Sequence, residues 1–246
     1  MGPGQTHSNL GVFLQSQSVD FTSKDNAADE LDGKPAARKS SSMYMRGMLR
    51  GQFSAGSKIG DGAYGTVFKV EFKDSALEQR VTGRAQSQNK TKFALKEMLI
   101  HRFINEGRIK EVFIERSILA SLDHPSIIKF YQSFKNQNKL FLLVEFCPRG
   151  SLMDFLKRQG CLNNVLAQHL TAEIVLALEY LRSMQIVHRD LKPGNIVLDA
   201  NYHIKLIDFA TCKVYNPAIQ AKIAAFQNKN DLLRSMGFND DTDLSH

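Results

Sequence analysis

The stretch that decides the fold of this chain is IVHRDLKPGNIVL, which runs from Ile186 to Leu198. It contains the pattern H-R-D-L-x-x-x-N, so that Asp190 and Asn195 stand in a polar loop between two apolar runs. A second motif, Asp208-Phe209-Ala210, follows the segment from Tyr202 to Ile207, whose alternation predicts a strand. A lone H-R-D tripeptide arises by chance, but this longer pattern followed by D-F is far more specific. The two motifs therefore indicate one site that both supply with polar side chains.

These two motifs resemble the catalytic loop and the D-F-G motif of protein kinases. The resemblance implies that Asp190 orients the substrate hydroxyl and that Lys192 assists beside the transferred phosphate as a point charge. It also implies that Asn195 and Asp208 bind Mg²⁺, a cation that prefers oxygen ligands. Such residues suit phosphoryl transfer, which requires positioning and charge neutralisation rather than covalent chemistry.

A glycine-rich segment near residue 60 has the form G-x-G-x-x-G-x-V. This pattern alone is weak, because it also opens Rossmann folds. The run from Thr66 to Phe72 alternates, however, and predicts a strand rather than a helix, which excludes a Rossmann dehydrogenase. The resemblance implies that this segment forms a flap over ATP. The flap residues are Ile59, Gly60, Asp61, Gly62, Ala63, Tyr64, Gly65, Thr66 and Val67.

A strand lysine and a helix glutamate complete the phosphate side of the expected nucleotide site. Lys96 lies in the sequence Phe-Ala-Leu-Lys, which resembles the kinase V-A-I-K strand, and would pair with the ATP phosphates. Apolar residues at helical spacing predict a helix from Arg108 to Leu122. Within it, Glu115 matches the family's lysine partner, and Glu106 and Glu111 are its competitors.

The expected adenine side of the site lies where two predicted strands end. The segments from Ile127 to Phe134 and from Lys139 to Phe146 predict a pair of strands. Glu145-Phe146-Cys147 then matches the hinge between the two kinase lobes, whose backbone groups bind adenine. Glu145 and Cys147 are therefore assigned to nucleotide binding, and Cys147 is interpreted as a pocket wall rather than a nucleophile.

A long amphipathic helix is predicted from Asn163 to Met184. We interpret His169 as a surface histidine of this helix rather than a metal ligand. The apolar residues that repeat at three to four positions predict a core stripe of Leu166, Leu170, Ile174, Leu178 and Leu181.

The run from Thr171 to Leu181, together with DFATCKV at 208–214, is similar to the AGC group of Ser/Thr kinases. Within that group it resembles the 3-phosphoinositide-dependent protein kinases. The implied fold is α+β and bilobal, with a β-rich N-lobe (53–146) and an incomplete helical C-lobe (147–226). Flanking this kinase domain (53–226), residues 1–52 and 227–246 are polar and predict disordered ends, and 74–92 predicts a mobile inserted loop.

The resemblance also implies a docking site for the hydrophobic tail of protein substrates. In the resembled kinases a small-lobe groove binds that tail, and the matching positions stay apolar here. An ordinary small-lobe core is an equally good interpretation of the same residues. They are Phe103, Ile104, Ile109, Val112 and Leu140.

Three departures from the family pattern concern the C-terminal part of the chain. Ala210 replaces the D-F-G glycine and loses its easy access to positive φ. Ala225 stands where the phosphorylated serine is found, so Arg189 is expected to lack a phosphate partner. No A-P-E motif follows, so we expect the helix at 163–184 to expose an apolar face. The alternative function is a non-catalytic kinase fragment or pseudokinase that binds nucleotide or a partner's tail.

Composition limits the other classes of function. The chain has 246 residues, of which 43% are hydrophobic, so it can bury a large core. No apolar run is long enough to span a membrane, and three scattered cysteines with no apolar leader favour a cytoplasmic protein. We interpret the net charge of +7 as a solvated surface, without a nucleic-acid partner. Met1–Thr6 formally fits a myristoylation pattern, although Pro3 is unfavourable there.

Overall fold

The structure, a computed structural model, describes residues 50–54, 56–62, 65–83, 91–136 and 139–224. All of them belong to one unit, Ser40–His246. The predicted tail at 1–52 lies outside the described residues except for its last three, which form the 3₁₀-helix η1 (Arg50–Gln52). The predicted end at 227–246, the myristoylation pattern and Ala225 also lie outside them. No helix in the described ranges is long and apolar enough to cross a membrane.

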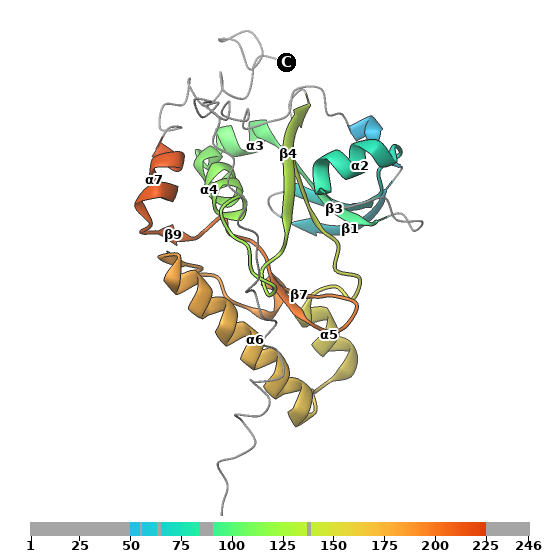
Figure 1. The fold of residues 1–246 in the computed structure, drawn as a ribbon, viewed down its shortest axis with the longest axis vertical. Coiled ribbons are helices and arrows are strands. Elements are labelled where there is room, and N and C mark those ends of the chain that lie inside the picture. The colour runs from blue at the N-terminus through green and yellow to red at the C-terminus, as the bar shows by residue number, and fades with distance from the viewer. Residues whose placement is uncertain (1–49, 55, 63–64, 84–90, 137–138, 225–246) are drawn as a thin grey trace, which may run out of the picture. The chain divides into compact units, whose positions relative to one another are not determined.

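A five-stranded antiparallel sheet forms the first layer, in the order β1-β2-β3-β5-β4 (Figure 1). Its strands are β1 (Ser57–Gly62), β2 (Gly65–Val70), β3 (Phe93–Leu99), β4 (Phe130–Asn136) and β5 (Lys139–Glu145). Ile127 and Ile128 precede β4, rather than beginning it, because Ile127 bridges to Leu206 outside the sheet. The predicted strands are otherwise present with ends shifted by one or a few residues.

The two faces of this sheet carry separate apolar clusters, because side chains alternate along each strand. Phe141 and Leu143 of β5 belong to a largely aromatic cluster with Phe53, Phe72 and Phe134. Leu140 and Leu142 belong instead to a cluster with the helices that follow β3. The central strands are thus buried on both faces, which fixes their register.

The predicted inserted loop at 74–92 is partly wrong, because its first half is the helix α2 (Ser75–Thr82). The Asp74 side chain accepts a hydrogen bond from the Ala76 backbone N–H, and Gly83 ends the helix with φ of 68°. Leu77 and Val81 pack against the aromatic cluster of the sheet. These contacts explain why a polar segment with few buried residues is helical.

Four helices follow α2 before the short strands that begin at Ile186. They are α3 (Ile100–Asn105), α4 (Ile109–Leu119), α5 (Leu152–Gln159) and α6 (Asn164–Ser183). Figure 1 shows α3 and α4 beside the sheet, whereas α5 and α6 lie beyond the short strands that follow. Asn163 caps α6 by accepting a hydrogen bond from the Leu166 backbone N–H at 2.8 Å.

The helix α6 buries a narrower stripe than its sequence predicts. Leu170, Ala177 and Leu181 are buried, but Leu178 is 37% exposed, so its assignment to the core is wrong. Ala177, which the pattern of large apolar residues did not include, is fully buried in the cluster. The expected exposed apolar face is present among the described residues, and its members are Val165, Val175, Leu176 and Leu178.

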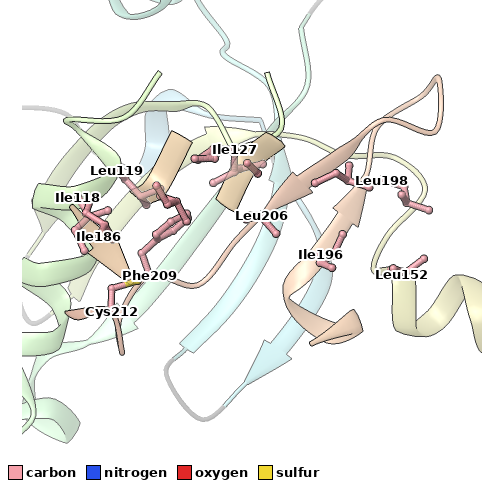
Figure 2. Close-up of a cluster of buried hydrophobic side chains, with 14 of the residues drawn as sticks. Ile118, Leu119, Ile127, Leu152, Ile186, Ile196, Leu198, Leu206, Phe209 and Cys212 are labelled. Atoms are coloured by element: carbon pink, nitrogen blue, oxygen red, sulfur yellow. The ribbon is translucent and has the colours of Figure 1, made fainter. Parts of the chain in front are cut away.

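Short strands and one helix complete the described chain. The pairs β6 (Ile186–Val187) with β9 (Lys213–Val214) and β7 (Ile196–Leu198) with β8 (Ile204–Leu206) are antiparallel. The 3₁₀-helix η2 (Pro193–Asn195) precedes β7, and α7 (Pro217–Ala224) holds most of the segment that resembles the activation loop. Figure 2 shows Ile186 of β6, Ile196 and Leu198 of β7 and Leu206 of β8 in one cluster with Ile118 and Leu119 of α4. Val214 of β9 and Ile219 of α7 belong to the same cluster. This cluster joins α4 to the loops that carry the polar motifs.

Candidate active site

A cavity of about 1020 Å³ lies between the sheet and the catalytic loop. Its walls include most residues that the sequence assigns to nucleotide and metal binding. Gly62, Thr66, Asp190 and Lys192 are not among its described wall residues, and Ala63 and Tyr64 lie outside the described residues. The sequence-predicted residues in its walls are Ile59, Gly60, Asp61, Gly65, Val67, Lys96, Glu115, Glu145, Cys147, Asn195 and Asp208.

One ion pair crosses the upper wall of this cavity. Lys96 Nζ donates to both carboxylate oxygens of Glu115, at 2.7 and 2.8 Å. Strand β3 holds Lys96 opposite Leu142, and α4 holds Glu115, which is only 4% exposed. The competitors Glu106 and Glu111 contact Arg108 instead. The pair fixes the lysine ammonium group beside the cavity, where an anionic ligand can meet it.

The Asp208 carboxylate faces the cavity with one oxygen unpartnered. Its Oδ1 is buried and has no hydrogen-bond partner among the described residues, and a buried polar atom without a partner is costly. Asp208 takes a positive φ of 65°, a conformation uncommon outside glycine. Asn195, also in the cavity wall, donates through Nδ2 to Asp190, which leaves its amide oxygen as a potential ligand. Two oxygen donors of this kind suit Mg²⁺.

The catalytic-loop motif is organised around the Asp190 carboxylate. Its Oδ2 accepts hydrogen bonds from Lys192 Nζ at 2.7 Å and from Asn195 Nδ2 at 2.8 Å. The Lys192 ammonium group, followed by the Asn195 amide, holds the pKa of Asp190 below its usual range. Asp190 is therefore an ionised acceptor at neutral pH, next to a positive charge.

The buried ring of His188 positions this loop. Its Nδ1 accepts from the Asp190 backbone N–H, and its Nε2 lies 3.1 Å from the Ile207 carbonyl oxygen. Burial lowers the pKa of His188, so its ring is neutral at neutral pH. Because Nδ1 accepts a hydrogen bond, the ring proton is on Nε2, which donates to the Ile207 carbonyl oxygen. His188 thus links the catalytic loop to the residue before Asp208. The Phe209 ring, in the cluster of Figure 2, lies edge-on to it at 5.1 Å.

The structure shows the local conformation at Ala210 and Arg189, two positions where the chain departs from the family pattern. Ala210 does not adopt positive φ, so the missing glycine causes no left-handed strain in this conformation. Arg189 donates through Nε to the Thr211 carbonyl oxygen at 2.6 Å. A backbone group therefore receives its charge-assisted hydrogen bond.

Of the two glycines in the glycine-rich turn whose surroundings the structure describes, Gly60 and Gly65, only Gly65 has no room for a side chain. Gly65 has φ of 145°, and a Cβ there would lie 2.0 Å from the Glu97 carbonyl oxygen. Gly60 has room, since its added Cβ would meet only the Val67 side chain at 3.7 Å. Thr66 donates to Asp61 and so stiffens the turn instead of lining the cavity. Gly65 therefore permits the close contact between β2 and β3, whereas Gly60 leaves space for a ligand in the cavity.

The hinge residues lie in the cavity wall, with their side chains otherwise engaged. Glu145 pairs through Oε1 with Lys205 Nζ at 3.1 Å, and its backbone N–H donates to the Lys129 carbonyl oxygen at 2.9 Å. Burial raises the pKa of the Cys147 thiol to about 12, so it is not an activated nucleophile. Sequence reasoning did not assign the apolar wall residues Ala94, Leu142, Val197 and Ile207 to the site. Ala94 was recognisable, because it lies two positions before Lys96 on the same face of β3.

The five residues of the expected docking site form part of the cluster beside α3 and α4. Phe103, Ile109, Val112 and Leu140 are buried, and only Ile104 is partly exposed. The structure thus brings them together as a packed core. A docked segment would have to enter beside Ile104.

Similarity to known proteins covers the part of the chain that builds this site. The protein kinase domain family matches residues 53–228. The serine/threonine-protein kinase PKH2 of Saccharomyces cerevisiae is 34% identical over 77% of this chain and 16% of its own length. The 3-phosphoinositide-dependent protein kinase B of Dictyostelium discoideum is 40% identical over 67% of this chain and 16% of its own. The human 3-phosphoinositide-dependent protein kinase 1 is 33% identical, over 71% and 29%. The chain therefore spans less than a third of the length of each of these relatives.

Proposed function

Because this chain belongs to the protein kinase family and resembles Ser/Thr kinases of the AGC group, we propose that it phosphorylates proteins. It would transfer the γ-phosphate of ATP to Ser or Thr hydroxyl groups. The observation that carries this proposal is the convergence on one cavity of the Lys96–Glu115 pair and the unpartnered Asp208 oxygen. A non-catalytic nucleotide-binding fragment is less favoured, because the Asp190, Lys192 and Asn195 side chains are already joined by hydrogen bonds.

The chemistry follows from the charges on this site. The ionised Asp190 carboxylate accepts a hydrogen bond from the substrate hydroxyl and aims its oxygen at the phosphorus. Lys192, 2.7 Å from that carboxylate, brings a positive charge beside the transferred group. Lys96, held by Glu115, binds the phosphates that remain on the nucleotide. Positioning and charge neutralisation are the main demands of phosphoryl transfer.

Asn195 and Asp208 would hold Mg²⁺ in this site. The buried Oδ1 of Asp208 fits this role, since a cation would supply the partner that it lacks. Bound Mg²⁺ neutralises charge on the phosphate oxygens. The residues of the glycine-rich turn cover the nucleotide, and the hinge backbone at Glu145 and Cys147 binds its base. Location in the cytoplasm stays a prediction from the sequence.

The test is a thermal melt of the purified chain with ATP, with and without Mg²⁺. A ligand that binds only the folded state stabilises it by about 2.7 kcal/mol at a hundredfold excess over Kd. We expect a Mg²⁺-dependent rise in Tm that Asp208→Asn abolishes and that Asp123→Asn, an exposed acid outside the cavity, leaves intact. An unchanged Tm for the native chain at saturating nucleotide would refute nucleotide binding.

We also propose that protein substrates dock a hydrophobic tail beside α3 and α4. The apolar cluster there includes Val112 of α4, the helix that carries Glu115. Docking at this cluster would therefore act on the cavity through α4. Ile104→Asp should weaken binding of a Phe-containing peptide about tenfold or more, since burying an Ile contributes about 1.5–3 kcal/mol. Fluorescence anisotropy measures this, with Val165→Asp, a change of an exposed apolar residue on α6, as the control. Equal binding by native chain and Ile104→Asp would contradict docking at this place.

A further inference from the structure

Three side chains with metal-binding atoms converge on the surface of α6, away from the cavity. His169 and Glu173 lie four residues apart on one face of the helix, and His203 reaches them from the turn before β8. Their donor atoms all lie within 4.8 Å of one another. None of the three lines the cavity. The proposed phosphoryl transfer therefore does not account for this cluster.

The distances within the cluster are close to those of a coordinated ion. Glu173 Oε1 lies 3.5 Å from His169 Nε2 and 2.6 Å from His203 Nδ1. Ligands about 2.0–2.1 Å from a tetrahedral Zn²⁺ are about 3.4 Å apart, so small side-chain rotations would seat the metal. Such rotations are open to both histidines, since their side chains are 38% and 49% exposed.

The surrounding structure fixes the one carboxylate and the loop that the site requires. Glu173 Oε2 accepts a hydrogen bond from the Ile204 backbone N–H at 2.8 Å, which leaves Oε1 directed at both histidines. Asp199 Oδ1 accepts from the His203 backbone N–H at 2.9 Å and holds the turn. Anchored ligands of this kind raise the affinity of a metal site.

We propose that His169, Glu173 and His203 form a binding site for a divalent transition metal, of which Zn²⁺ is the best fit. Two imidazoles and one carboxylate suit Zn²⁺ and not Mg²⁺, and the fourth position of the tetrahedron would hold water. The metal would clamp α6 to the turn that leads through β8 to Asp208. His169, interpreted from the sequence as a surface histidine, acquires a role because His203 folds next to it.

The test is isothermal titration of Zn²⁺ into the full chain after removal of metal with a chelator. We expect one site, which His169→Gln and His203→Gln each weaken about tenfold or more, since each removes one of three protein ligands. His101→Gln, a change of an exposed histidine on α3, should leave it unchanged. Mg²⁺ should not compete.

A melt without metal checks that the variants fold. His203→Gln removes a hydrogen bond to Glu173, whereas His169 lies farther from that carboxylate, so His169→Gln tests the site with least disturbance. Loss of the Zn²⁺-induced rise in Tm in both variants, with His101→Gln unaffected, supports the proposal. Equal Zn²⁺ affinity in all four proteins, or no binding by the native chain, overturns it. Neither result depends on kinase activity.

Discussion

At the scale of single residues, two glycines of one motif have different physical duties. Gly65 lets β2 approach β3 so closely that any Cβ would collide with the Glu97 carbonyl oxygen. Gly60 faces no such contact. Within the motif G-x-G-x-x-G, Gly65 is therefore required for strand packing, whereas Gly60 leaves space in the cavity.

We predict that Gly65→Ala destabilises the fold and that Gly60→Ala does not. Backbone strain of this kind costs about 1–3 kcal/mol, and the collision at 2.0 Å adds to it. Urea unfolding of the two variants beside the native chain measures the difference. Equal unfolding midpoints for both variants would show that β2 does not lie close enough to β3 to exclude a side chain at position 65.

Motif residues were predictable one by one, but the apolar cavity wall was not. Lys96 and Glu115 have distinctive chemistry and spacing, so the sequence identified both partners of the ion pair. Val197 and Leu142 are ordinary strand residues, and only the folded arrangement shows that they face the cavity. The same holds for His203, because no local pattern places it beside His169.

At the scale of elements, long apolar periodicity was a better guide than polar composition. Helix α6 was predicted within one residue at each end, because Asn163 caps a clear repeat. Helix α2 was missed, since it buries no residue fully and depends on Asp74 and Gly83 at its ends. Leu178 was wrongly assigned to the core, because a pattern built from large apolar residues does not show that the neighbouring Ala177 is the buried one.

The exposed face of α6 makes the next prediction. Val175 and Leu176 are 56% and 49% exposed, and replacing both with lysine should reduce self-association. The free energy of unfolding should change by no more than about 0.5 kcal/mol, as for other surface changes. Light scattering and urea unfolding measure the two effects.

A buried residue of the same helix is the matched control. Leu181 is 1% exposed, and Leu181→Ala should cost about 2–5 kcal/mol. If the double lysine variant were destabilised as strongly as Leu181→Ala, the face of α6 would be covered rather than exposed.

At the scale of the whole described molecule, the apolar cluster of Figure 2 connects the sheet layer to the catalytic loop. It joins α4, which carries Glu115, to Phe209, which follows Asp208. The bilobal α+β fold implied by the sequence is present. It could be predicted because the motifs indicate which strands and loops surround the cavity. The predicted disordered ends stay predictions for residues 1–49 and 227–246, which lie outside the described ranges, whereas residues 50–52 form η1.

We propose that this chain transfers phosphate, and incorporation of radiolabelled γ-phosphate into a Ser-containing substrate measures this transfer. With Mg²⁺ and ATP we expect transfer that Asp190→Asn slows on the order of 100-fold or more, the usual contribution of a positioned acid–base group. Asp123→Asn should transfer at the native rate. No transfer by the native chain, or an equal rate for Asp190→Asn, would contradict the account.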